Sequence, residues 1–258
     1  MRGEAFFSFP AVPYAASADG ERTGAAGRLV RRPAFGALIR IDLMPAYHSF
    51  RTMTVDPTDR VAVAARYAEG FVFTRRGNTV MQQARSVRVP LRNFVLSSEN
   101  RRVMKRTAEV ALRVVPLVSF SYQWQIGKMA KDFYARFGAR AFSANKVKEL
   151  FTSARSPMNT VLAYGDGNAH DVGYCLAYAL PSFLHYAYPF YEHARDPSLG
   201  MAMMTKAVFW AQDAGKEYIY LGSVRDEQSL YKFQFNGIEW FDGQQWRQGK
   251  PSGLFVSG

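Results

Sequence analysis

The chain has 258 residues, and a composition of 48% hydrophobic and 15% aromatic residues excludes an intrinsically disordered protein. Its 33 Lys and Arg residues outnumber 21 Asp and Glu residues, and the net charge of +12 favours a polyanionic partner, either nucleic acid or a membrane surface. The single cysteine, Cys175, excludes an internal disulfide and a multi-cysteine metal site, and the four histidines have no metal-binding spacing.

No apolar run approaches the roughly 18 residues that a membrane span needs. We therefore expect a cytoplasmic protein with no membrane association. We also expect no metal and no cofactor. A signal cleavage site in the Ala-rich stretch near residue 15 is the alternative. Residues 15–33 are small, polar and basic without a hydrophobic period, so residues 1–34 are expected to be a mobile segment, with order beginning near Phe35.

The first ordered part is expected to be a basic α+β unit over residues 35–122. A helix is predicted over 57–69, with Asp56 or Thr58 as its cap and Gly70 as its stop. A hairpin then turns at Arg75-Arg76-Gly77-Asn78 between strands near 71–75 and 79–90. A short helix at 98–107 and a strand at 112–120 complete the unit.

Helical spacing of apolar residues returns in residues 123–156 and predicts an insert of two helices, the second capped by Ser143. In residues 157–258 apolar and polar residues alternate more regularly. Three antiparallel strands, ending with SFLHYAYPFY, are expected to run into a helix over 198–214, and EYIYLGSV reads as a buried strand. Both halves run strands into a helix and then another strand, which is compatible with two related α+β units.

The start of the helix at 198 is the first candidate site. The strand before it delivers Tyr188 and Tyr191, Ser198 is placed to cap the helix, and Leu199 and Gly200 would present unpaired backbone N–H groups. Such a helix terminus can hold a phosphate or an oxyanion. An ordinary capped helix without a ligand is the alternative. An acetyl-CoA site is a weaker one, because the Arg/Gln-x-x-Gly-x-Gly/Ala spacing is missing.

Basic side chains form the second candidate site. Arg101, Arg102, Lys105 and Arg106 share helical faces and could neutralise phosphates, and Arg75, Arg76, Arg85, Arg88 and Arg92 precede them with no acidic residue between Thr74 and Phe94. A solvated charged face is the alternative. The sequence gives little support for a catalytic nucleophile. Cys175 lies in an apolar strand, and no third residue completes a catalytic triad with His193 and Ser198.

Five blocks in order resemble the arginyl/leucyl-tRNA-protein transferase family over residues 43–246. They are GFVFTRRGN, VRVPLRNFVLSSENRRVMKR, YPFYEHARDPSLG, YIYLGS and YKFQFNGIE. The family's cysteine cluster is absent, with PAYHSFRT and GNTVMQQARS in its place. Glu192, Pro197, Ser98 and Gly237 also depart from the family's residues, which puts donor and acceptor specificity in doubt.

The resemblance implies tandem acetyltransferase-like (GNAT-like) units with mixed, largely antiparallel sheets. It implies an aminoacyltransferase of arginyl or leucyl type that moves an amino acid from aminoacyl-tRNA to a protein or peptide N-terminus, as in N-degron labelling. The expected catalytic residues are Tyr188, Tyr191, Ser198, Leu199, Gly200 and Lys232, with Glu192, Tyr220 and Tyr231 binding substrate and Arg75, Arg76, Arg88, Arg101, Arg102, Lys105 and Arg106 binding tRNA. By spacing alone Lys232 is an exposed strand lysine. A non-catalytic tRNA-binding relative and an acyl-CoA-dependent N-acetyltransferase are the alternative functions.

Overall fold

The computed structural model describes residues 50–74, 77–138, 141–165, 171–224 and 227–251. The expected mobile segment at 1–34 and the onset of order near Phe35 lie outside these residues. Within them, no helix is long and apolar enough to cross a membrane, and no cluster of three His, Cys, Asp or Glu side chains could hold a metal ion.

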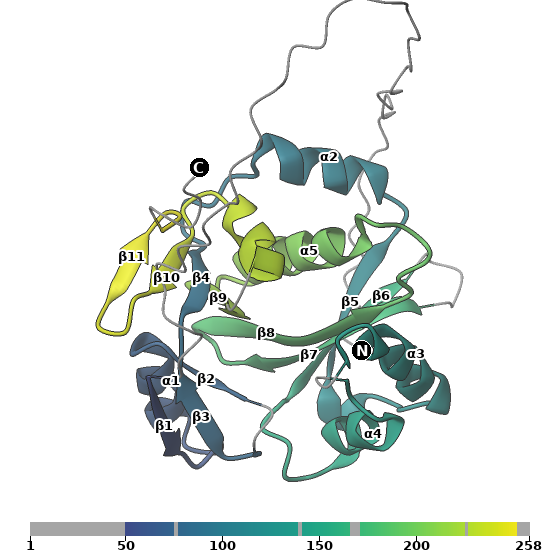
Figure 1. Cartoon of the computed structure of the whole chain (residues 1–258), viewed down its shortest axis with the longest axis horizontal. Helices are drawn as coiled ribbons and strands as arrows, with labels where there is room; N and C mark the ends of the chain where they lie inside the picture. The colour runs from purple at the N-terminus through teal and green to yellow at the C-terminus, as the bar shows by residue number, and fades with distance from the viewer. Residues whose placement is uncertain (1–49, 75–76, 139–140, 166–170, 225–226, 252–258) are drawn as a thin grey trace, which may run out of the picture.

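A mixed sheet of eight strands forms the centre of the fold (Figure 1). Only the β8–β9 pair is parallel, and every other pair is antiparallel. The strand order is β11 (Trp246–Gln248), β10 (Glu239–Phe241), β4 (Ser86–Pro90), β9 (Tyr218–Ser223), β8 (Phe183–Tyr191), β7 (Asp171–Ala179), β6 (Thr160–Gly165), β5 (Ala111–Pro116). An antiparallel three-stranded sheet of β1 (Arg51–Thr54), β3 (Val80–Gln83) and β2 (Phe71–Phe73) accompanies it. The expected α+β class with mixed, largely antiparallel sheets is confirmed.

Helices cover both faces of the large sheet and bury a hydrophobic core on each (Figure 1). On one face α5 (Leu199–Asp213) packs on the sheet, with α2 (Ser98–Arg106) beside it. On the other face lie α1 (Arg60–Ala68), α3 (Trp124–Ala135) and α4 (Ala144–Thr152). Two 3₁₀ helices, η1 (Leu117–Ser119) and η3 (Glu227–Gln234), complete the described elements.

Local sequence signals fix most of the helix ends. The side chains of Ser97 and Ser143 accept backbone N–H groups at the starts of α2 and α4, and Gly70 ends α1 with a φ of +81°. The expected Asp56 or Thr58 cap is wrong by a few residues. Asp59 caps α1 by accepting from the Ala62 amide, while Asp56 binds Thr58 in the preceding turn.

Three expected strands differ in the structure. The strand expected at 79–90 is two strands, because the chain kinks at Ala84, where the Ser86 amide donates to its carbonyl at 2.6 Å, and β3 and β4 enter different sheets. The strand at 112–120 ends at Pro116 and continues as η1. Lys232 lies in η3 rather than in a strand.

The large sheet combines strands from both expected units. β5 pairs with β6, whereas β4 lies between β9 and β10 and therefore not beside β5. The boundaries of the two units and of the insert stay a prediction.

Candidate functional site

The candidate site is built where the two parallel strands separate. β9 pairs with β8 only from Phe183↔Tyr218 to His185↔Tyr220. Beyond this point β8 stays paired with β7, and the β7–β8 register shifts between Leu176 and Ala177, which leaves Ala187 as an extra residue in β8. Such a bulge bends a strand. We call residues 186–191 of β8 and 221–223 of β9 the β8–β9 fork.

Helix α5 follows the fork, and the Asp196 side chain caps the start of this helix. The Asp196 carboxylate accepts the Ser198 amide at 2.6 Å, and the Asp196 carbonyl accepts the Leu199 amide at 3.1 Å. Arg106 of α2 pairs with the same carboxylate at 3.0 Å. The Ser198 side chain makes no capping hydrogen bond to the described residues. Ser198 therefore occupies the expected cap position without the expected side-chain hydrogen bond, and the expectation of an unpaired Leu199 amide is wrong.

Gly200 brings Tyr191 close to the first turn of α5. A Cβ atom at Gly200 would lie 2.5 Å from the Tyr191 hydroxyl oxygen, so the missing side chain makes room for this ring rather than for an open ligand site. The ring also contacts Phe133 of α3, with the ring centres 4.7 Å apart. Tyr191 thus sits at the junction of both cores.

η3 places two further predicted residues at the fork. The Lys232 ammonium donates to the Ser223 carbonyl at 2.8 Å, at the end of β9. Tyr231 is 40% exposed, yet protein atoms surround its hydroxyl, and this burial, with Tyr191 as the next cause, raises the pKa of Tyr231 to about 12. A tyrosine hydroxyl is already protonated at neutral pH, and this shift keeps the Tyr231 hydroxyl protonated at higher pH as well, so it can donate a hydrogen bond.

A buried Tyr–His pair closes the base of the fork, and sequence reasoning missed it. The Tyr67 hydroxyl of α1 lies 2.8 Å from Nδ1 of His185, the last β8 residue paired with β9. Burial, with the charge of Lys232 as the second cause, lowers the pKa of His185 to about 3, so the ring is neutral. The two residues are 118 positions apart, and no local pattern signals their contact.

Of the remaining residues, Tyr188, expected to be catalytic, and Tyr220, expected to bind substrate, lie in the core, whereas Glu192 lies nearer the surface. Tyr188 is 7% and Tyr220 2% exposed, and both belong to the core beneath α1, α3 and α4. Glu192 is half-buried and its amide donates to the Val172 carbonyl. The structure thus places Tyr191 against Gly200 with Tyr231 near Tyr191, holds Lys232 at the end of β9, and buries Tyr188 and Tyr220 away from solvent.

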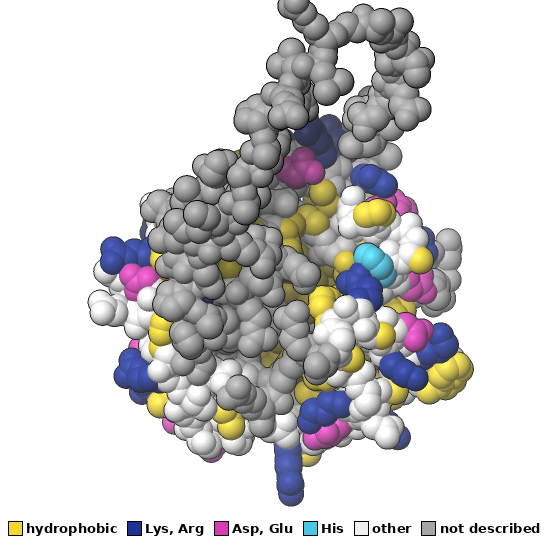
Figure 2. All heavy atoms as spheres, in the orientation of Figure 1, with side chains coloured by type: hydrophobic (Ala, Val, Ile, Leu, Met, Phe, Trp, Pro, Cys, Tyr) yellow, Lys and Arg dark blue, Asp and Glu magenta, His cyan; other side chains and the backbone are white. Residues whose placement is uncertain are grey.

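The basic side chains of α2 are exposed as expected. Val103 and Met104 face the protein, whereas Arg101, Arg102, Lys105 and Arg106 face outward. Arg102 pairs with Glu99 at 3.5 Å. On the face shown in Figure 2, basic and acidic side chains are interspersed around the rim. The α2 residues therefore offer charge to a phosphate backbone, although two of them also have acidic partners.

Arg88 differs from the α2 residues because its guanidinium is enclosed. It lies 4.0 Å from the ring centres of both Tyr218 and Trp246 and pairs with Glu239 at 2.7 Å. This geometry explains Arg88 as a link between β4, β9 and the β10–β11 hairpin. Arg75 and Arg76 lie outside the described residues.

Fold and fork together define a class of α+β protein. Its mixed sheet separates between two parallel strands, Lys232 is bound at the end of one of them, and Tyr231 lies near Tyr191 at the end of the other. Hydroxyl and ammonium groups that donate hydrogen bonds suit the stabilisation of negative charge that develops on an oxygen atom.

No family model matches the sequence. An aspartate/glutamate leucyltransferase from Xylella fastidiosa is 26% identical over 219 residues, which cover 76% of this chain and 83% of that protein. A protein of the same name from Vibrio cholerae is 25% identical and covers 68% of this chain and 78% of its own length. The name of these relatives describes an aminoacyltransferase.

Solved structures give more distant likenesses. The chain is similar to L-PGS from Bacillus licheniformis, with a TM-score of 0.44, 12% identity, and coverage of 74% of this chain and 63% of that one. The C-terminal domain of a putative lysylphosphatidylglycerol synthetase from Agrobacterium fabrum gives a TM-score of 0.43 at 11% identity, covering 69% of this chain and 56% of that one.

Proposed function

We propose that this chain is an aminoacyltransferase that moves an amino acid from charged tRNA to the N-terminal amine of a protein or peptide. The similarity to proteins named aspartate/glutamate leucyltransferase, which spans three quarters of the chain, carries the proposal. That name points to a leucyl donor and to acceptors that begin with Asp or Glu. An arginyl donor is the alternative within the same reaction.

The reaction asks little acid–base chemistry of the protein. The acceptor nitrogen attacks the carbonyl carbon of the aminoacyl ester, a C–N bond forms and the ester C–O bond breaks. The terminal ribose hydroxyl of the tRNA leaves, and the proton lost by nitrogen passes to that oxygen or to solvent. An α-amine has a pKa near 8, so a useful fraction is neutral at physiological pH. Alignment and oxyanion stabilisation remain as the main tasks.

The residues at the fork suit those tasks. The Tyr231 hydroxyl, which like any tyrosine hydroxyl is protonated at neutral pH and whose pKa burial raises further to about 12, can donate to the developing oxyanion. The Lys232 ammonium supplies a positive charge that is already positioned by the Ser223 carbonyl. Tyr191 lies against Gly200 and forms the wall beside the first turn of α5. We assign Ser198 and Leu199 to shaping this turn rather than to contacting substrate.

The same geometry disfavours the acyl-CoA alternative. A CoA pyrophosphate at the start of α5 would need the backbone N–H groups there, but Asp196 accepts those of Ser198 and Leu199. Its negative charge would also repel a pyrophosphate. Bound CoA would therefore have to displace both this cap and the Arg106–Asp196 ion pair.

Transfer of radiolabelled amino acids from a total charged tRNA pool tests the proposal. Peptides that begin with Asp, Glu, Arg, Lys or Ala serve as acceptors, and the product identifies donor and acceptor together. We expect leucine on the Asp and Glu peptides. Salt-sensitive tRNA binding without any transfer would favour a non-catalytic RNA-binding protein, and protection against heat by CoA but not by charged tRNA would favour an acetyltransferase.

A further inference from the structure

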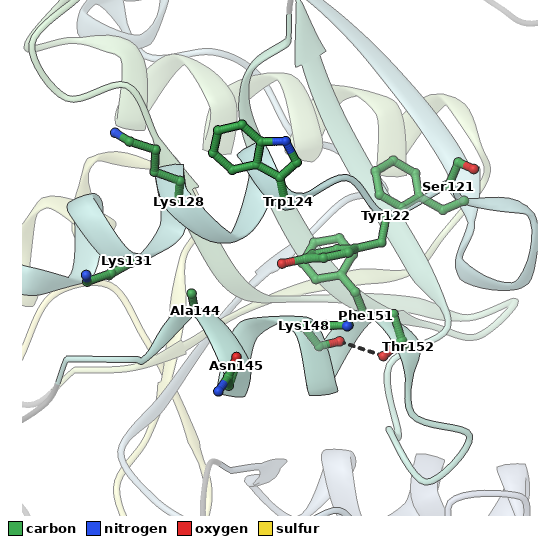
Figure 3. Close-up of a pocket in the computed structure, with 11 residues that line it drawn as sticks. Ser121, Tyr122, Trp124, Lys128, Lys131, Ala144, Asn145, Lys148, Phe151 and Thr152 are labelled. Atoms are coloured by element: carbon green, nitrogen blue, oxygen red, sulfur yellow. Dashed lines mark hydrogen bonds between the residues drawn. The ribbon is translucent and has the colours of Figure 1, made fainter.

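A pocket of about 830 Å³ opens between α3 and α4, away from the fork (Figure 3). Its lining comes from residues 120–131 and 144–152, and none of these residues belongs to the fork or to α2. The pocket lies on the face of the sheet opposite α5 and α2 (Figure 1). It therefore needs an explanation separate from the proposed transfer site.

Aromatic rings form the walls and floor of this pocket. Trp124 is 68% exposed, whereas Phe151 is buried and its ring centre lies 5.5 Å from that of Tyr122. A Cβ atom at Gly127 would collide with the Tyr122 hydroxyl, so α3 tolerates a glycine, which weakens a helix interior, and Tyr122 lies against it. The arrangement presents flat apolar surface to a ligand.

Lysines supply the charge of the pocket. Lys128 and Lys131 come from α3 and Lys148 from α4 (Figure 3), and no Asp or Glu is among the lining residues. Lys128 is also paired with Asp132 at 2.8 Å, while Lys131 and Lys148 are exposed. The pocket thus combines exposed aromatic surface with three cations, which fits an anion that carries a planar ring.

We propose that this pocket binds a nucleoside phosphate, with the base stacked on Trp124 and Tyr122 and the phosphate held by Lys131 and Lys148. Stacking on aromatic rings beside cationic side chains is the general mode in which proteins hold single-stranded nucleotides. A free nucleotide and one unit of an RNA strand offer the same chemistry. The proposal does not depend on aminoacyl transfer, because binding is measured without charged tRNA or acceptor.

Direct binding of AMP, by calorimetry, and of a labelled single-stranded hexa-adenylate, by fluorescence anisotropy, tests the proposal with the full chain. Replacing Trp124 by Ala removes one stacking surface and is expected to weaken binding roughly 5- to 150-fold, whereas Trp124→Phe retains most of the affinity. Lys148→Ala is expected to lower the slope of log affinity against log salt by about 0.7 for the RNA.

Lys146→Ala is the matched control, because this lysine also lies on α4 but pairs with Glu149 and does not line the pocket. Binding of both probes supports a general nucleotide site, and binding of the RNA alone supports a strand-binding site. The proposal is overturned if neither probe binds, if the Trp124→Ala and Lys148→Ala variants bind like the Lys146→Ala control, or if an acidic hexapeptide displaces the RNA at equal concentration.

Discussion

Single residues decide how the fork is shaped, and Gly200 is the clearest case. Tyr191 approaches its backbone so closely that even one methyl group has no space. Oxyanion-stabilising groups act only when they are held within a fraction of an ångström. Small changes of this kind should therefore affect transfer more strongly than folding.

Gly200→Ala is expected to move Tyr191 away from α5. Overpacking of this kind costs about 1–3 kcal/mol of unfolding free energy, and the transfer rate should fall by a larger factor than this loss of stability explains. Urea unfolding and transfer kinetics measure the two effects. A variant as stable and as active as the parent chain would show that Tyr191 is not held by this contact.

The Tyr67–His185 pair predicts a specific pH dependence of stability. The pKa of His185 is lowered from its ordinary value of 6.5 to about 3 in the folded state, so the unfolded state binds the extra proton between these values. The contribution is fully present above about pH 6.5 and is lost as pH falls toward 3, by about 1.4 kcal/mol per pH unit in mid-range.

His185→Gln removes this titration, because glutamine carries no ionisable group. Urea unfolding of both proteins between pH 4 and 7 isolates the effect from that of the carboxylates, which titrate in both. The difference in unfolding free energy between parent and variant should shrink as pH falls. A difference that stays constant over this range would contradict the assignment of a neutral, buried His185.

At the scale of elements, α2 connects the basic surface to the start of α5. Arg106 pairs with the Asp196 carboxylate that caps α5, while Arg101, Arg102 and Lys105 face solvent. These contacts connect the predicted tRNA-binding surface directly to the start of α5.

Arg102→Ala is expected to weaken tRNA binding and to lower the magnitude of the salt slope by about 0.9, the value for one phosphate contact to a duplex. Arg66→Ala on α1 is the matched control, since both arginines pair with a Glu three residues away on the same helix. Filter binding between 50 and 200 mM salt gives both slopes, and equal slopes for the two variants would remove α2 from the RNA-binding surface.

At the scale of the whole molecule, the large sheet joins residues that are distant in sequence. β4, from the first half, separates β9 from β10, both from the second half. A fragment of residues 157–258 therefore lacks a strand inside its own sheet. We expect it to show no cooperative urea transition, whereas the full chain does. A sharp transition with a slope scaled to the length of the fragment would show an independent unit.

Local signals were sufficient for much of this architecture. Ser143 and Gly70 mark helix ends by side-chain capping and backbone geometry that depend only on neighbouring residues. Apolar spacing likewise predicted α3, α4 and the β6–β7–β8 meander, and Cys175 is buried as expected.

The structural features that could not be predicted from the sequence depend on contacts between residues that are far apart along the chain. The split into β3 and β4 follows from which sheet each strand joins, and the alternation of residues 79–90 is the same in either case. The ion pair between Arg106 and the Asp196 carboxylate joins residues 90 positions apart. The Tyr67–His185 pair and the aromatic–lysine pocket arise only when separate helices and strands pack together.

The most direct test of the account is the rate of leucyl transfer from charged tRNA to a peptide beginning with Asp, compared between Lys232→Ala and Lys216→Ala. Both lysines donate to a backbone carbonyl, Ser223 and Leu180 respectively, but only Lys232 lies at the fork. We predict a loss of about 100-fold or more for Lys232→Ala, the size seen when an oxyanion-stabilising group is removed, and near-parental transfer for Lys216→Ala. Equal rates for the two variants, or no transfer by the parent chain, would contradict it.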